Sequence, residues 1–363
     1  MAAEDRAVMP RFATAAPAGD RSARAKFALI VLLVLLGATV LVSLTAGASD
    51  ASPWTLLAEW LRGDGVLSER DRLIIYDIRM PRVLLGALIG AALAVSGAVM
   101  QGLFRNPLAD PGLIGVSAGA ALGAVSVIVL GPTLFFGYTA TLGIYALPVA
   151  AFAGGLITTL ILYRISTRQG RTSVATMLLA GIAIAALANA LLGYLVFIAD
   201  DRQLRDITFW NLGSIAGATW VKVVAIGPII ALAVATAPFL AKGLNALTLG
   251  EATAAHLGVP VQRFKYIAIV AVAAATGASV AVSGGIGFVG IVVPHLLRLS
   301  IGPDNRYLLP ASALLGASLL LIADAVSRTI VAPAELPIGI VTAAAGAPVF
   351  LWILLSRRGL LHL

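Results

Sequence analysis

Long apolar runs alternate with short segments that hold most of the charged residues throughout this chain of 363 residues. A helix needs about 20 mostly apolar residues to cross the hydrocarbon of a bilayer, and ten runs approach or reach that length. Hydrophobic residues make up 60% of the chain and charged residues 12%, against roughly half and a quarter in soluble domains. The sequence therefore predicts an all-α polytopic membrane protein with about ten transmembrane helices.

The predicted spans form one transmembrane domain over residues 27–358. Residues 1–26, rich in alanine, arginine and proline, are expected to form a disordered cytoplasmic tail, and residues 359–363 a short cytoplasmic tail. The ten spans cover 27–46, 83–103, 113–130, 142–163, 174–198, 220–240, 266–283, 288–300, 308–323 and 338–355.

The distribution of lysine and arginine sets the orientation, since short cytoplasmic loops retain these residues. With the N-terminus inside, most of the 25 Lys and Arg residues fall in cytoplasmic segments. An even number of spans returns the basic pair Arg357 and Arg358 to the same side. Both termini are therefore predicted to be cytoplasmic.

The first apolar run has a second interpretation. A basic stretch, an apolar run and the small residues Ala46, Gly47 and Ala48 together resemble a cleaved secretion signal. The run is longer than the ~7–15 residues of a signal core, and nine further spans follow it. A retained membrane span is therefore the favoured interpretation.

Several kinds of chemistry lack the residues they need. The chain has no cysteine and only three histidines, at separate places, so no metal-ligand pattern is present. None of its lysines is followed by Ser or Thr, so it lacks the phosphate loop of an ATPase. No nucleophile and base set or nucleic-acid-binding module is visible. We therefore predict a chain that is not an enzyme, has no catalytic or metal-binding residues and binds no cofactor, so that any nucleotide hydrolysis must belong to a partner.

An ion-coupled secondary transporter is the alternative from another class. Such carriers usually keep ionisable groups near the membrane midplane, whereas Asp324 and Glu335 lie near the ends of predicted spans. Because some carriers bind sodium through backbone carbonyls, this alternative stays open.

Three blocks of sequence carry motifs that occur together in one family. The first block contains RMPR at 79–82, SGAVMQG at 96–102 and NPLADPGLIG at 106–115. The second contains LGE at 249–251, HLG at 256–258 and SGGIGFVGIVVPH at 283–295, and the third contains ELPIGIVT at 335–342 and GAP at 346–348. In this order they resemble the FecCD-like permeases, the membrane subunits of bacterial ABC importers for ferric siderophores, haem and cobalamin. The resemblance covers nearly everything after residue 75.

This resemblance implies the type II ABC importer permease fold, with a homodimer of the chain around a central pathway in the bacterial inner membrane. It also implies two cytoplasmic ATPase subunits and one periplasmic substrate-binding protein as partners. The segment ADDRQLRDITFW at 199–210 is most similar to haem permeases. Haem is therefore the expected ligand, with a ferric siderophore or cobalamin as the alternative.

The glycines of the first block recur at helical spacing, as in the pair Gly86 and Gly90. Small residues allow helix backbones to approach closely inside a membrane. We therefore expect these glycines to mark tight packing between helices.

The segment 244–260 is the longest predicted internal loop and is expected to form short helices broken at Gly250 and Gly258. It holds more apolar residues than a plain solvated linker, the alternative interpretation, would need. The resemblance implies that it seats in the ATPase and couples the two subunits. The residues expected to do so are Leu249, Gly250, Glu251, His256, Leu257 and Gly258, with Glu251 and His256 acting as contacts or caps.

Three arginines lie at the external ends of predicted spans, Arg79 and Arg82 at the start of one and Arg328 after another. Long basic side chains at such places often snorkel to the membrane interface, which is the simplest interpretation. The resemblance implies instead that they receive acidic residues of the substrate-binding protein through charge-assisted hydrogen bonds.

Two further segments are expected to shape the pathway. The resemblance places the cytoplasmic closure between the fourth and fifth spans, where Thr172, Ser173 and Thr176 are the gate candidates. Helix capping by these hydroxyl side chains is the alternative. Residues 199–220 interrupt the apolar pattern with charges and tryptophans, and are expected to form a short re-entrant helix beside the pathway.

Overall fold

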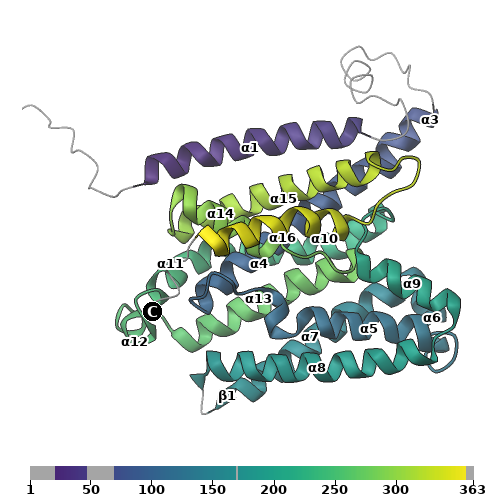
Figure 1. Ribbon diagram of the computed structural model, residues 1–363. Helices are drawn as coiled ribbons and strands as arrows, with labels where there is room; N and C mark the ends of the chain where they lie inside the picture. Colours follow the sequence, from purple (N-terminus) through teal and green to yellow (C-terminus); the bar gives the residue numbers. More distant parts are fainter. Residues whose placement is uncertain (1–20, 47–68, 169–170, 357–363) are drawn as a thin grey trace, which may run out of the picture.

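The computed structural model describes residues 21–46, 69–168 and 171–356. These residues are almost entirely helical, and the long helices run roughly alongside one another in a bundle (Figure 1). The described strands, β1 (Thr167–Arg168) and β2 (Arg171–Thr172), form a short antiparallel hairpin in which Thr167 pairs with Thr172. The predicted helical fold class is confirmed.

The hairpin divides the helices into two groups along the chain. Before it lie α1 (Ser22–Thr45), α3 (Glu69–Arg72), the π-helix η1 (Leu73–Arg79), α4 (Met80–Leu103), the 3-10 helix η2 (Pro111–Ile114), α5 (Val116–Leu130), α6 (Phe136–Leu142), η3 (Gly143–Tyr145) and α7 (Ala146–Ser166). After it lie α8 (Val174–Ile198), α9 (Asp201–Leu212), α10 (Trp220–Ala235), α11 (Ala237–Leu247), α12 (Glu251–His256), α13 (Val261–Ser283), α14 (Val289–Ile301), α15 (Asn305–Thr329) and α16 (Ile338–Ser356).

The observed helices coincide with the predicted apolar runs. Six helical stretches of the described chain are long and apolar enough to cross a membrane: 22–45, 69–103, 136–166, 174–198, 261–283 and 305–329. The pair α10 and α11, bent by 41°, makes a seventh if counted as one span. Three shorter apolar helices, α5, α14 and α16, occupy the remaining predicted spans. The count of ten spans and the cytoplasmic position of the termini stay predictions.

Helix boundaries differ from the predictions at several places: the stretches 69–103 and 136–166 begin earlier than predicted, and two further differences concern α1 and the span 220–240. Helix α1 begins at Ser22, inside the segment expected to be a tail, while residues 1–20 and 359–363 lie outside the described residues. The predicted span 220–240 breaks at Thr236, where α10 ends and α11 begins. Pro238 explains this break, because it has no N–H to bond to the Val234 carbonyl of a continuous helix and its ring would clash there, whereas proline is tolerated in the first turn of a new helix.

Helix α4 runs through the interior of the bundle, whereas α1 and α8 lie on its outer sides (Figure 1). It packs against α15 through glycines. Gly90 of α4 meets Gly316 of α15 so closely that an added side-chain carbon would collide with the Gly316 backbone. This is the close helix approach expected from the spacing of Gly86 and Gly90.

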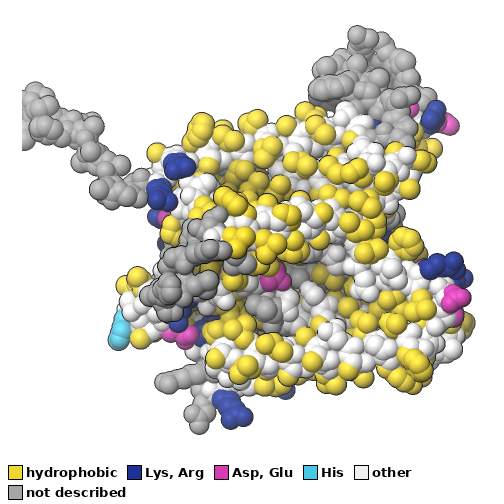
Figure 2. Space-filling model, viewed as in Figure 1, with side chains coloured by type: hydrophobic (Ala, Val, Ile, Leu, Met, Phe, Trp, Pro, Cys, Tyr) yellow, Lys and Arg dark blue, Asp and Glu magenta, His cyan; other side chains and the backbone are white. Residues whose placement is uncertain are grey.

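Apolar side chains cover much of the outer surface (Figure 2). Phe197 of α8, Leu232 of α10 and Phe239 of α11 are among the most exposed of the described large apolar side chains. A protein surrounded by water rarely leaves so large an apolar surface open. These faces are therefore suited to contact with lipid or with another subunit.

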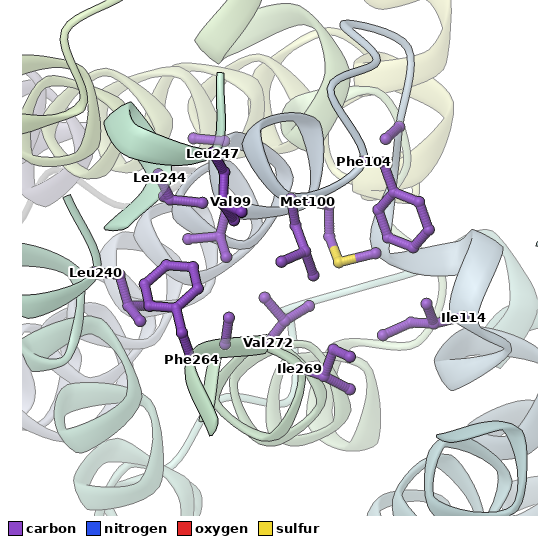
Figure 3. Close-up of a cluster of buried hydrophobic side chains, with 14 of the residues drawn as sticks. Val99, Met100, Phe104, Ile114, Leu240, Leu244, Leu247, Phe264, Ile269 and Val272 are labelled. Atoms are coloured by element: carbon purple, nitrogen blue, oxygen red, sulfur yellow. The ribbon is translucent and has the colours of Figure 1, made fainter. Parts of the chain in front are cut away.

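A buried apolar cluster fixes α11 to α4 and α13 (Figure 3). Leu240, Leu244 and Leu247 project from α11 into this cluster, where they meet Val99 of α4 and Phe264 of α13. The helix that leads into the predicted coupling segment is thus part of the packed interior.

Candidate functional site

The predicted coupling segment 244–260 consists of the end of α11 and the short helix α12. Gly250 and Gly258 flank α12 with φ angles of +103° and +86°, a backbone conformation that glycine adopts without steric cost. The predicted breaks at these two glycines are confirmed.

Apolar residues of this segment divide into two groups. Leu247 and Ala254 are buried, whereas Leu249 and Leu257 are 64% and 63% exposed. The buried pair attaches the segment to the bundle. Leu249 and Leu257 thus lie exposed on either side of α12, where a partner could cover them. His256, next to Leu257, is exposed as well.

Lys265 of α13 connects α12 to the hairpin. Its Nζ lies 2.7 Å from Oε1 of Glu251, the first residue of α12, and donates to the Thr172 carbonyl at 2.9 Å. The Thr172 N–H donates to Oε1 of Gln262 at 2.9 Å. The structure thus brings together a predicted coupling residue and a predicted gate residue. Lys265 and Gln262 were not identified as site residues from the sequence. The one feature that could have pointed to Lys265 is its position at the edge of the apolar run 266–283.

The other gate candidates, Ser173 and Thr176, form the start of α8. Ser173 is the N-cap residue, and its Oγ accepts hydrogen bonds from the Thr176 N–H at 3.3 Å and from Thr176 Oγ1 at 3.0 Å. Thr172 is buried and its hydroxyl bonds to that of Thr167. Helix capping, the alternative interpretation of these hydroxyl side chains, is therefore realised at Ser173.

The three predicted docking arginines lie together where α1, α4 and α15 meet. Arg82 of α4 donates to both oxygens of Asp324, at 2.9 to 3.2 Å, and to both oxygens of Glu335 at 2.9 Å. Arg328 lies 3.1 Å from Asp324 and donates to Ser43, and Arg79 donates to the Leu44 carbonyl at 2.7 Å.

This arginine cluster is buried among protein groups and is not spread along the lipid interface. The side chains of Arg82 and Asp324 are 7% and 1% exposed, whereas that of Glu335 is 39% exposed. Arg82 and Arg328 both pair with Asp324, and Arg82 pairs with Glu335 as well. Glu335 is the carboxylate through which the cluster reaches the surface.

Polar side chains also join α11 to the start of α15. Asn245 donates to Asp304 at 2.8 Å and accepts from the backbone N–H of Asn305 at 2.9 Å. Arg306 pairs with Asp304 at 2.7 Å. The hydrogen bond from Arg306 outweighs partial burial and lowers the pKa of the Asp304 carboxyl.

The segment expected to be a re-entrant helix is helical in its first part, as α9. A capping box between Asp200 and Gln203 starts this helix. Its end lies against the N-terminus of α16, since the Leu212 carbonyl leaves no space for a side chain at Gly339. The position of α9 beside a pathway stays a prediction.

A cavity of about 320 Å³ lies between α4, α13 and the segment 284–291. Its lining includes Asp110 and the buried Thr276. Asp110 accepts a hydrogen bond from the Gly112 N–H at 2.7 Å and so caps η2. Within the described residues, no group of three or more His, Asp or Glu side chains is placed to hold a metal ion.

Comparison with known proteins agrees with this arrangement. The chain matches the FecCD transport family over residues 32–356. It is 46% identical over 329 residues to the hemin transport system permease protein HmuU of Yersinia pestis, covering 90% of this chain and 95% of that protein. It is 41% identical over 342 residues to the vitamin B12 import system permease protein BtuC of Klebsiella pneumoniae, covering 93% and 96%.

A solved structure is also similar. An inward-facing metal-chelate type ABC transporter matches with a TM-score of 0.78 and 33% identity, over 91% of this chain and 99% of that one. The fold and these matches define a membrane permease of the type II importer class.

The chain belongs to the FecCD transport family. It is a multi-pass permease subunit of an ABC importer in the inner membrane and is not itself an enzyme. An ATPase and a substrate-binding protein are its partners by family membership.

Proposed function

We propose that two copies of this chain form the passage for an iron-bearing ligand, with haem as the first candidate. The observation that carries this choice is the 46% identity to a hemin permease, against 41% to 43% to vitamin B12 permeases. A ferric siderophore is the second iron-bearing candidate, and because these identities are close, cobalamin, which carries no iron, is the alternative ligand from the same family.

The proposed energy source lies outside the chain. Two ATPase subunits on the cytoplasmic face use ATP and Mg, and this chain binds no cofactor of its own. The segment 244–260 seats in the ATPase through Leu249, Gly250, Glu251, His256, Leu257 and Gly258. The exposure of Leu249 and Leu257 supports this role, because contact with a partner would cover them.

One periplasmic binding protein is proposed to dock over Arg79, Arg82 and Arg328. The close grouping of these three guanidinium groups supports this, since acidic side chains of a partner are attracted to arginines. Charge reversal of Arg79 and Arg82 to Glu is expected to weaken docking and to reduce uptake. Unchanged stimulation of ATP hydrolysis by the binding protein, in a variant that still folds, would contradict this role.

Thr172, Ser173 and Thr176 are proposed to form the cytoplasmic gate. Their place at the hairpin and at the first turn of α8 supports this, because small hydroxyl side chains leave room for two copies of the segment to approach. A bulky substitution at exposed Thr176 is expected to slow release of substrate without changing ATP binding.

Uptake measurements test the choice of ligand. The permease, its ATPase and its binding protein are reconstituted in liposomes and offered haem, cobalamin or a hydroxamate ferric chelate at equal concentration. ATP-dependent uptake of haem above the other two is the expected result. Preference for cobalamin or for the chelate would overturn the proposed ligand but not the family assignment.

A further inference from the structure

Lys265 is the largest fully buried side chain among the described residues, although it carries an ammonium group. It lies in the second turn of α13. Removing such a group from water carries a large desolvation penalty, so it must be compensated by an opposite charge and by hydrogen bonds.

Two separate elements supply this compensation. The Glu251 carboxylate belongs to α12, and the Thr172 carbonyl belongs to β2. Neither group comes from α13 itself. The lysine is therefore satisfied only while α12 and the hairpin both keep their places beside α13.

The hairpin is held at both backbone polar atoms of one residue. The Thr172 carbonyl accepts from Lys265 and its N–H donates to Gln262, one turn earlier on the same helix face as Lys265. The next residue, Ser173, caps α8. A shift of these α13 side chains therefore acts directly on the hairpin and on the first turn of α8.

The Glu251 end of the link lies at the protein surface. Its side chain is 42% exposed, against 2% for Lys265. We propose that Lys265 is a positioning residue that passes movement of α12 to the hairpin β1–β2. This inference rests on the proposed function, in which α12 contacts the ATPase and Thr172 belongs to the gate.

The physical reason is the cost of separating the pair. When the ATPase displaces α12, the Glu251 carboxylate moves with it. Lys265 follows its counter-charge, because staying behind leaves a buried ammonium without one. The hydrogen bond to Thr172 then lengthens or moves, and the hairpin is released or carried along.

Coupled transport tests the link. In liposomes that contain the whole importer, Lys265→Met is expected to lower uptake per ATP hydrolysed about tenfold, while ATP hydrolysis itself stays close to that of the natural chain. Glu251→Gln is expected to act in the same direction, because it removes the counter-charge of Lys265, and its effect is expected to be smaller in the Lys265→Met background than in the natural chain. Arg263→Met is the matched control, because Arg263 is exposed on the same helix two residues away.

Fluorescent labels report movement of α12 and of the hairpin. A purely structural role of Lys265 would not change how these labels respond to ATP. The chain has no cysteine, so Thr253→Cys on α12 and Arg168→Cys on the hairpin each provide one labelling site when the partners are cysteine-free. In the natural chain both labels are expected to respond to ATP. In the Lys265→Met background only the label on α12 should respond.

The outcomes distinguish failure of the proposed coupling role of α12 from failure of the proposed Lys265 link. If the α12 label ignores ATP in the natural chain, the proposed coupling role of α12 is wrong. If the hairpin label responds equally with and without Lys265, or if uptake per ATP is unchanged, the link is wrong and the coupling role stands. Should Lys265→Met fail to assemble, Lys265→Gln carries the same test, because it keeps a side chain that can donate to the Thr172 carbonyl but removes the charge that pairs with Glu251.

Discussion

Gly97 of α4 and Gly290 of α14 lie backbone against backbone, with no space for a side-chain carbon between them. One turn further along α4, Gln101 donates to the Gly290 carbonyl at 3.2 Å. The motif SGAVMQG at 96–102 and the motif SGGIGFVG at 283–290 are thus two sides of one helix contact. Residues distant in the sequence combine here into a single packing unit.

Gly97→Ala should therefore destabilise the protein strongly. The added methyl group meets the Gly290 backbone, which cannot rotate away, and such overpacking costs about 1–3 kcal/mol or more. Thermal unfolding in detergent measures the effect. Gly37→Ala is the control, since nothing lies within 4 Å of the added carbon there; equal melting temperatures for the two variants would contradict the packing account.

Loss of Arg82 should destabilise the bundle more than loss of an exposed arginine. Arg82→Met leaves the buried Asp324 with Arg328 as its remaining cation, and breaking a buried ion pair costs roughly 3–5 kcal/mol. Arg306→Met removes an exposed pair and should cost less than about 1 kcal/mol. Denaturation of both variants in the same detergent measures how much unfolding free energy each one loses. Similar losses for the two variants would mean that the buried cluster contributes little to stability.

Glu335→Gln should strengthen docking of the binding protein. The change removes the exposed carboxylate of the arginine cluster and raises its net charge, so an acidic partner is attracted more strongly. Association rates at low and high salt measure this, and the gain should shrink as salt screens the charges. A slower association, or one independent of salt, would count against docking at this cluster.

Replacing an exposed leucine beside α12 should release the ATPase without unfolding the permease. Leu257→Glu places a charge where we propose an apolar contact, so co-purification of the ATPase is expected to fall about tenfold or more. Thr253→Glu, at another exposed position of α12, is the control. Retained ATPase in Leu257→Glu would show that this leucine is not part of the contact.

The stability contributed by Asp304 should depend on pH. Its pKa is lowered by Arg306, so the carboxylate stabilises the folded state above the ordinary carboxyl pKa of about 4 and loses this effect as pH falls through its lowered value. Asp304→Ala, which also removes the cap of α15, should cost about 1 kcal/mol at pH 7. The difference in melting temperature from the natural chain should narrow toward pH 3; a difference that widens there would contradict this.

Much of the fold follows from the apolar pattern alone. The predicted span 174–198 coincides with α8, and the breaks at Gly250 and Gly258 lie where the backbone needs positive φ. Apolar run length and glycine geometry are local properties, so the chain reveals them without its tertiary structure. The bend at Thr236 was missed because a long apolar run hides a break within it.

The pairing of charged residues could not be predicted in the same way. Arg82 meets Asp324 only because α4 packs against α15, and Lys265 meets Thr172 only because the hairpin folds onto α13. Both contacts join residues far apart in the sequence. The sequence could identify Arg82 as a site candidate, but it could not show that two carboxylates already occupy its guanidinium group.

ATP-driven uptake tests the central claim most directly, namely that this permease draws its energy from a separate ATPase. Liposomes holding the permease are compared with and without the ATPase, in each case with the binding protein, ATP and an imposed proton or sodium gradient. Accumulation of ligand only when the ATPase hydrolyses ATP, whatever the gradient, is the predicted result. Accumulation by the permease alone, driven by an ion gradient, would contradict the account and favour a secondary transporter.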